Sequence, residues 1–196
     1  MAKAVARGED VNSVDESNNT ALHHAAWAGY HTIVKLLLAD QRVDVNHSGF
    51  NGNRPLHQAA STGQARVLQL LLAHQEVEVN CKNDLGATPL ETAAYEGWEK
   101  VVKILLADQR VEVNNSDKYG YTALHNAAYM DHSNLVQLLL ADPRVELNNK
   151  NKYSLTPVMV ALVEESKNSL SLLLDHPDVD LDTKDKEGRG LLVVAR

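Results

Sequence analysis

Histidines are the residues of this sequence whose type and spacing could support chemistry. His23 and His57 lie 34 residues apart, His125 follows at twice that spacing, and His24 is adjacent to the first of them. An imidazole can bind a metal ion or exchange a proton near neutral pH. Ligands of one metal ion lie about 3–4 Å from one another, however, whereas equivalent side chains of stacked segments lie farther apart. We therefore predict a structural role for these histidines and no metal site.

The motifs of the common enzyme classes are absent from the sequence. It contains no nucleophile elbow, phosphate-binding loop, HExxH motif or paired cysteines. The single cysteine, Cys81, has no activating neighbour in the sequence, and we interpret it as a thiol at the edge of a hairpin. The numerous carboxylates fit an acidic, solvated surface. We predict no catalytic residues, no cofactor and no metal ligands, and we expect that the protein is not an enzyme.

The composition narrows the choice of partner and compartment. The chain of 196 residues has a net charge of −7 and contains no block of basic residues. Because such a surface repels a phosphate backbone, we expect no binding to nucleic acid. No apolar run approaches the roughly 20 residues that cross a membrane. Residues 1–7 lack the apolar core of a secretory signal, and one cysteine permits no intrachain disulfide. We predict a monomer in the cytoplasm, with the nucleus as the alternative compartment.

One segment, Thr20–Ala26, recurs along the chain at a constant step of 34 residues. A fixed period of this size is typical of a stacked repeat array. The copies begin with Thr or Arg and carry Ala-Ala at their end; the fifth copy is diverged and the sixth is a stump. They are residues 54–60, 88–94, 122–128, 156–162 and 190–192.

Each period is predicted to fold as a turn and two short helices. Thr20 suits a helix N-cap, and the next position is proline in three other copies, where a missing N–H is tolerated. Gly29 is placed to end the first helix. The second helix, residues 33–38, is apolar on most sides, so we expect its neighbours to cover it on both sides. The alternation in residues 43–46 predicts an extended arm, which leads into a hairpin with glycine at its tip, as at Gly52.

These elements, with copies that together follow the pattern Thr-Pro-Leu-His before Ala-Ala and with an Asp-Val-Asn arm, resemble the ankyrin repeat over nearly the whole chain. The resemblance implies an all-α solenoid of helix-turn-helix units with protruding β-hairpin loops. It also implies that the repeated histidine forms hydrogen bonds within and between repeats. We predict one domain, residues 1–196: an N-terminal partial repeat at 1–14, in which residues 2–12 form a second helix and arm, repeats at 15–48, 49–82, 83–116, 117–150 and 151–184, and a truncated cap at 185–196.

Several positions depart from the usual repeat. Residues 39–42 and their copies add one residue to a repeat that usually has about 33, and this should lengthen an outer loop. Asp131 replaces the glycine that ends a first helix, and Ser154 replaces a hairpin glycine. Glu91 stands in the histidine position and forms a predicted capping box with Thr88.

The arms carry asparagines at one fixed position, Asn46, Asn80, Asn114 and Asn148. The resemblance implies that such residues can be substrates of an asparaginyl hydroxylase. The alternative is that their side chains bond to backbone groups of the turn. We favour the alternative because the sequence match follows from the fold itself.

The resemblance places the partner-binding surface on the hairpin tips and on the exposed face of the first helices, which line a concave groove. Seven of the nine aromatic residues fall there, and Tyr and Trp are common anchors of interfaces. The alternative is that some rings pack on the adjacent hairpin. The predicted partner-binding residues are Trp27, Phe50, Tyr95, Glu96, Tyr119, Tyr121, Tyr129, Met130 and Tyr153.

The sequence therefore predicts a module that binds a partner protein or peptide without catalysis. Tyrosines with Glu96 and Glu164 nearby favour a segment that carries Arg or Lys. Two alternatives stay open. One is an engineered or excised scaffold without a native partner, since both predicted ends cut through repeats; the other is the targeting module of a larger enzyme.

Overall fold

A computed structural model describes residues 10–194, so the predicted helix within residues 2–12 lies mostly outside the described residues. Contacts divide the chain into two compact units, residues 1–89 and residues 90–196, here called unit 1 and unit 2. Within residues 10–194 the regular structure is helical, and β-pairing is limited to three isolated bridges. None of the helices in this range is both long and apolar enough to cross a membrane.

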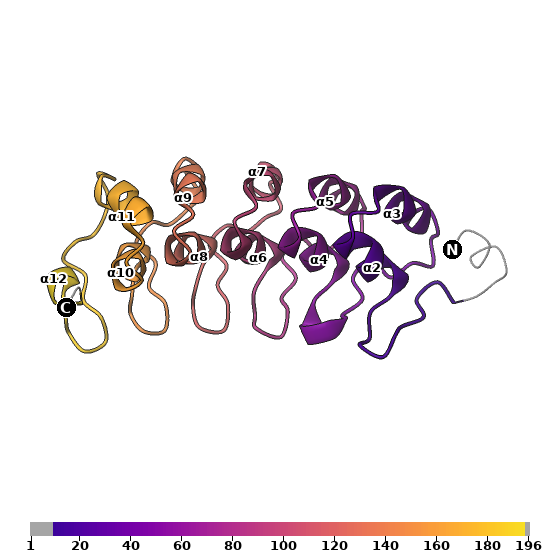
Figure 1. Cartoon of the computed structure of the whole chain (residues 1–196), viewed down its shortest axis with the longest axis horizontal. Coiled ribbons are helices and arrows are strands. Elements are labelled where there is room, and N and C mark those ends of the chain that lie inside the picture. The colour runs from indigo at the N-terminus through magenta and orange to yellow at the C-terminus, as the bar shows by residue number, and fades with distance from the viewer. Residues whose placement is uncertain (1–9, 195–196) are drawn as a thin grey trace. The chain divides into compact units, whose positions relative to one another are not determined.

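Unit 1 consists of two helix pairs joined by long loops (Figure 1). The first helix of each pair packs on its own second helix and on the first helix of the other pair, and the two second helices also pack together. The elements are α2 (Ala21–Trp27), α3 (His31–Leu38), the 3-10 helix η1 (Phe50–Gly52), α4 (Pro55–Ser61) and α5 (Ala65–Leu72).

Unit 2 repeats this arrangement with further pairs. The first helices form one row and the second helices another, with the loops projecting from the row of first helices (Figure 1). Within it, α8 packs on α10 and α9 packs on α11, and α12 packs on α10. The helices are α6 (Pro89–Glu96, whose first residue closes unit 1), α7 (Glu99–Ala107), α8 (Ala123–Tyr129), α9 (Ser133–Leu140), α10 (Pro157–Val163), α11 (Lys167–Leu174) and α12 (Leu191–Val194).

The repeated histidines fix the start of the first helices and the loop that follows. In α8, the backbone N–H of Thr122 donates to Nδ1 of His125 at 3.2 Å, and Nε2 of the same ring donates to the carbonyl of Leu155 at 3.0 Å. His23 and His57 make the equivalent pairs of bonds in unit 1. All three rings are buried. The predicted structural role, within and between repeats, is confirmed for these three residues.

Small side chains let the first helices approach closely. Ala25 and Ala26 of α2 are buried, and so are the matching alanine pairs of α4, α6 and α8. The second helices bury most of their apolar side chains, although single positions stay open to solvent. Val34 and Leu37 of α3 are buried, but Leu36 is 60% exposed. In unit 2, α9 packs on both α7 and α11, as we expected for such a helix. For α3 the neighbour on the N-terminal side lies outside the described residues.

The positions of the helix ends and loop tips keep a left-handed backbone even where glycine is replaced. Gly29 ends α2 with φ of 73°, and Asp131 and Glu165 hold the same place in later repeats with φ of 53° and 57°. At the loop tips Gly120 has φ of 82° and Ser154 has φ of 61°. The repeats therefore diverge in residue type while the backbone conformation persists.

The predicted extended arms do not form strands. Residues 45 and 46 lie in a turn, although Val43 and Val45 are both buried as their alternation predicted. The arm asparagines join neighbouring arms instead. Nδ2 of Asn114 donates to the carbonyl of Arg144 at 2.7 Å, and its Oδ1 accepts from the N–H of Glu146 at 2.8 Å.

Asn46 and Asn148 make the same two bonds to the arms that follow them. The asparagines thus satisfy backbone groups, as predicted, but those groups belong to the next repeat rather than to their own turn. Successive arms are therefore joined by hydrogen bonds of the asparagine side chains and not by a β-ladder.

The additional residue of the long repeat lies in a loop closed by an ion pair. Oδ1 of Asp40 accepts from the backbone N–H and from Nε of Arg42, both at 3.0 Å, and Oδ2 accepts from Nη2 at 2.6 Å. These bonds, with the side chain of Arg42 foremost, lower the pKa of Asp40 to about 2. Asp108–Arg110 and Asp142–Arg144 repeat the arrangement in unit 2.

Candidate partner-binding surface

The residues that could support chemistry are engaged in structure. Burial, the main cause, lowers the pKa of His57 and of His125 to about 4, so both rings are neutral at neutral pH. Cys81 is buried beside His57, with Sγ 3.7 Å from Nδ1. Burial raises the pKa of this thiol to about 12, so little reactive thiolate is present. Among the described residues, no three His, Cys, Asp or Glu side chains are grouped as a metal would require.

Unit 1 contributes two of the predicted partner-binding residues. Trp27 at the end of α2 and Phe50 in η1 are 59% and 56% exposed. With His23, His24, Asn19 and Gln58 they line a shallow pocket of about 380 Å³. The N–H of Phe50 donates to Oδ1 of Asn19 at 3.1 Å, which holds the loop against the preceding one.

Unit 2 contributes the other seven, and five of them are tyrosines. We call Tyr95, Tyr119, Tyr121, Tyr129 and Tyr153 the tyrosine patch. The rings of Tyr95 and Tyr129 stack with centroids 6.4 Å apart and planes 24° apart. Tyr121 meets Tyr129 edge-on, also at 6.4 Å. These three rings therefore form a contiguous cluster.

The backbone beneath the cluster is held by side-chain hydrogen bonds. Nε2 of His132 donates to the carbonyl of Tyr95 at 3.0 Å, and Oγ of Ser166 donates to the carbonyl of Tyr129 at 3.1 Å. The N–H of Tyr121 donates to Oδ1 of Asp117 at 2.9 Å. Because each ring projects from a fixed main chain, little backbone freedom would be lost on contact with a partner.

The cluster is open to solvent. Tyr95 is 44% exposed, Tyr129 is 38% exposed, and Met130 beside them is also exposed. Tyr121 is half-buried, and burial raises its pKa, with a further rise from the carboxylate of Glu164. Rings that stack on one another yet remain open can serve a partner as well as the fold.

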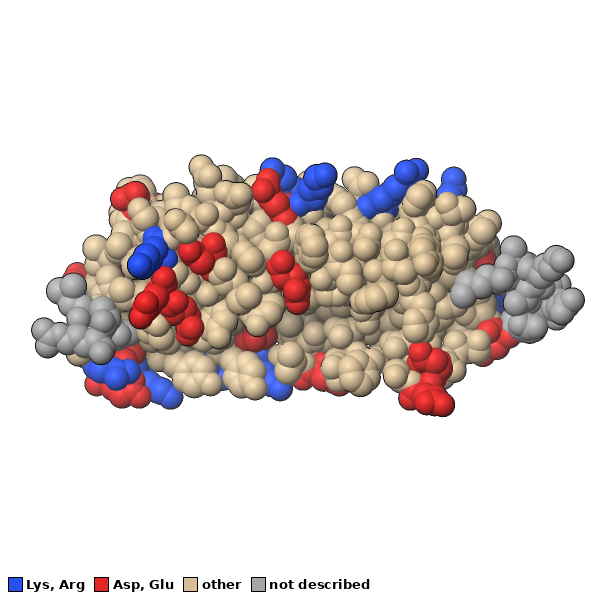
Figure 2. Space-filling model, in the orientation of Figure 1, with Lys and Arg blue, Asp and Glu red and all other residues tan. Residues whose placement is uncertain are grey.

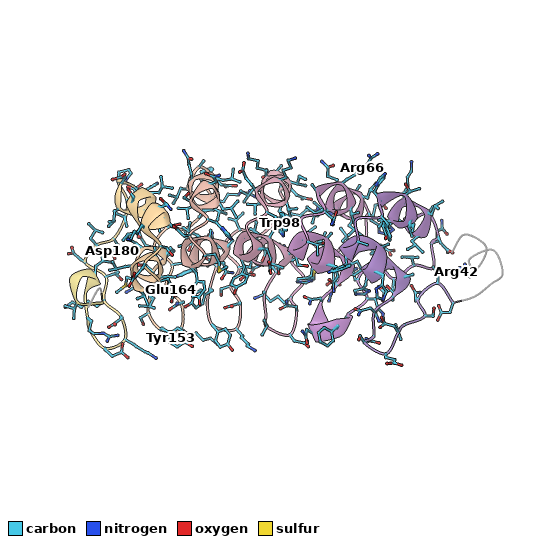
Figure 3. The ribbon with its side chains drawn as sticks, viewed as in Figure 1. Arg42, Arg66, Trp98, Tyr153, Glu164 and Asp180 are labelled. Carbon is cyan, nitrogen blue, oxygen red and sulfur yellow. The ribbon has the colours of Figure 1, made fainter. Side chains whose placement is uncertain are left out.

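The outer part of the patch lies at the loop tips and carries lysines. Nζ of Lys118 lies 5.2 Å from the ring centroid of Tyr119. Nζ of Lys186, from the loop that follows that of Tyr153, lies 4.8 Å from the centroid of Tyr153. Figure 3 shows Tyr153 near its loop tip and Glu164 at the level of the helices. The rings of Tyr119 and Tyr153 therefore each lie beneath a lysine ammonium group of the same chain.

Glu96 and Glu164 lie at the ends of α6 and α10, and both are exposed. In the described part of the chain neither has a basic side chain within ion-pair distance. The structure thus places the predicted residues in two groups, Trp27 with Phe50 in unit 1 and the remaining seven in unit 2. Lys186 and exposed Val163 were not among the predicted residues, although the 34-residue register assigns both to the same surface positions.

A comparison with protein families matches most of the chain. A model described as ankyrin repeats, in three copies, matches residues 1–83 and residues 56–151. The two matches overlap and together span residues 1–151, which is well over half of the chain. No curated protein matches the sequence.

Proposed function

Since the chain belongs to the ankyrin-repeat family, we propose that it is a protein–protein interaction module whose main contact surface is the tyrosine patch of unit 2. Ankyrin repeats are in general modules of this kind. A fold of this type does not name the partner, so the proposal depends on the surface. Under this proposal, the chain binds a protein or peptide segment, catalyses no reaction and acts in the cytoplasm.

The observation that carries the proposal is the contiguous cluster of Tyr95, Tyr121 and Tyr129. Binding energy in interfaces concentrates in clustered residues, among which Tyr and Trp are enriched. A tyrosine ring also brings a large contact area at a small entropic cost, because it has few rotatable bonds. These rings lie on the unit's surface and not in its alanine- and leucine-rich core.

Removing two rings tests the proposal. We expect Tyr95→Ala with Tyr129→Ala to weaken retention of peptides from a phage-displayed random 12-residue library at least about tenfold, since interface anchors contribute about 2 kcal/mol or more each. The thermal midpoint should fall only slightly, because an aromatic pair contributes about 0.5–1.5 kcal/mol to the fold. The matched control is Tyr30→Ala, which removes an exposed tyrosine of unit 1.

Three results would count against the proposal. A large loss of thermal stability in the double variant would assign the rings to the fold. If the double variant and Tyr30→Ala lose peptide retention to the same extent, the peptides bind somewhere other than the tyrosine patch. If the wild-type chain retains no peptide at all, a scaffold without a native partner is favoured.

A further inference from the structure

The side of unit 2 that carries the tyrosine patch has opposite charges along its two edges. We call Lys118, Lys152 and Lys186 the lysine row, and Glu96 with Glu164 the glutamate pair. The lysines occupy one register position in three successive loops, and all three are exposed. Figure 2 shows several acidic groups, with one basic group among them, at the level of the helices of unit 2, and both basic and acidic groups at the lower edge, where its loops end.

Contacts between successive loops make the lysine row continuous. The N–H of Lys152 donates to the carbonyl of Tyr119 at 2.9 Å, which joins the first tip to the second. Lys186 lies over the ring of Tyr153, which joins the third tip to the second. The three lysines therefore belong to adjoining loop tips at one edge of the patch, and the ammonium groups of Lys118 and Lys186 lie over its outer rings.

The glutamate pair lies at the opposite edge, at the ends of first helices. Tyr95 precedes Glu96 in α6, and the stacked rings of Tyr95 and Tyr129 bring this helix end beside that of α8. A further bond from Nδ2 of Asn126 to the carbonyl of Glu91, at 3.4 Å, joins the same two helices. Since α8 packs on α10, Glu164 continues this edge on the far side of Met130.

Neither edge is neutralised within the unit. In the described residues, no carboxylate lies within ion-pair distance of a lysine of the row, and no basic group does so for the glutamate pair. Tyr121, between the edges, has negative Glu164 and Asp117 among its charged neighbours. Charges that remain unpaired across an interaction surface are the means by which a partner is oriented and selected.

We propose that unit 2 binds a partner segment of mixed charge, with arginine directed at the glutamate pair and acidic side chains directed at the lysine row. The inference rests on the proposed function and adds the chemistry of the partner. Apolar groups of the segment would cover the tyrosine patch between the two edges.

Arginine suits the glutamate edge better than lysine does. Its flat guanidinium stacks on aromatic faces while its N–H groups bond a carboxylate in a forked geometry. Tyr121 and Tyr129 offer two rings near Glu164, and the lysines over Tyr119 and Tyr153 show that the patch accommodates cations. On the lysine edge, the ammonium groups would meet Asp or Glu as compact charges.

The test begins with the peptides selected from the random 12-residue library. We expect them to contain both Arg and an acidic residue. Against a synthetic peptide of this kind, Glu164→Lys should raise Kd at least about tenfold, and exchange of the peptide's Arg for Glu should restore binding to this variant. Lys152→Glu should require the reverse exchange at the acidic position. Such charge-swap pairs isolate a direct contact.

The control variants change the net charge equally elsewhere in unit 2. Glu146→Lys and Lys150→Glu alter exposed residues outside the patch, and each should change Kd less than about twofold at 0.15 M salt, where distant charges are screened. Selection of purely basic or uncharged peptides would overturn the inference and leave the proposed function standing. Equal effects of patch and control variants would also overturn it. Failure to select any peptide would instead count against the proposed function.

Discussion

At the scale of single residues, the histidines of the first helices connect successive repeats through hydrogen bonds. The Nδ1 of each ring accepts a backbone N–H and the Nε2 donates to a carbonyl of the next loop, so only the neutral ring satisfies both bonds. A protonated ring would direct a second N–H at a donor and would carry its charge into a buried site. The stability of the fold therefore depends on a pH at which these rings are neutral.

We predict that stability falls as the pH is lowered from about 6.5 to about 4. The pKa values of His57 and His125 are about 4 in the folded chain, below the ordinary 6.5, so the unfolded chain binds more protons in this window. The stabilisation is present above pH 6.5 and is lost toward pH 4, by about 2–3 kcal/mol for each ring. Urea denaturation midpoints across the window measure this loss.

A variant pair assigns the effect. His125→Gln should flatten the pH dependence by roughly a third to a half, since it removes one of the three buried rings whose pKa is lowered, His23, His57 and His125. The control variant is His31→Gln, which removes a histidine of α3 that makes none of these bonds. An equal slope in the wild type and in His125→Gln would contradict the assignment.

At the scale of elements, the ends of the first helices show how divergence is tolerated. Asp131 and Glu165 both hold the left-handed backbone where earlier repeats have glycine. Asp131 offsets the conformational cost with two bonds, from Nδ2 of Asn168 and from the N–H of Ser169, each at 2.8 Å. Glu165 makes no side-chain bond among the described residues, so its cost is not compensated in this way.

We expect Glu165→Gly to stabilise the chain by about 1 kcal/mol, because a non-glycine residue in this region costs about 1–2 kcal/mol. Asp131→Gly should be neutral or destabilising, because it removes two hydrogen bonds of about 0.5–1.5 kcal/mol each. Thermal melting of the two variants beside the wild type measures the difference. A gain for Asp131→Gly that equals the gain for Glu165→Gly would show that the bonds contribute nothing.

At the scale of the whole molecule, the chain is a family member with an acidic surface. The net charge of −7 opposes close approach of a second copy, whereas the mixed charge of unit 2 would favour a complementary segment. The two effects act on different partners. Self-association is therefore a useful check on the surface that we propose.

We predict that the chain sediments as a monomer of 21.6 kDa at 10–100 µM (concentrations on the order of ordinary binding assays). Analytical ultracentrifugation at about 0.15 M salt measures the mass. A dimer that Tyr95→Ala with Tyr129→Ala disperses would mean that the tyrosine patch binds a second copy of this chain, which would refute the monomer expectation.

Much of the fold follows from the 34-residue period alone. The position of Thr20 predicts the start of α2, and the three prolines predict the first residues of α4, α6 and α10. The conformation at Asp131 and Ser154 follows from the glycines that they replace. The prediction that residues 43–46 are extended was wrong, because the alternation of valines indicates only that Val43 and Val45 are buried. Both side chains can be buried when the backbone forms a turn.

The site divides in the same way between sequence and structure. The register by itself determined that Tyr95 and Tyr129 lie outside the core, because equivalent positions of a repeat face the same surroundings. Only the tertiary structure decided that their rings stack, that Tyr121 joins them, and that Lys186 reaches the ring of Tyr153. The first and last of these contacts join residues from different repeats, and all three depend on side-chain directions and loop geometry that a linear period does not contain.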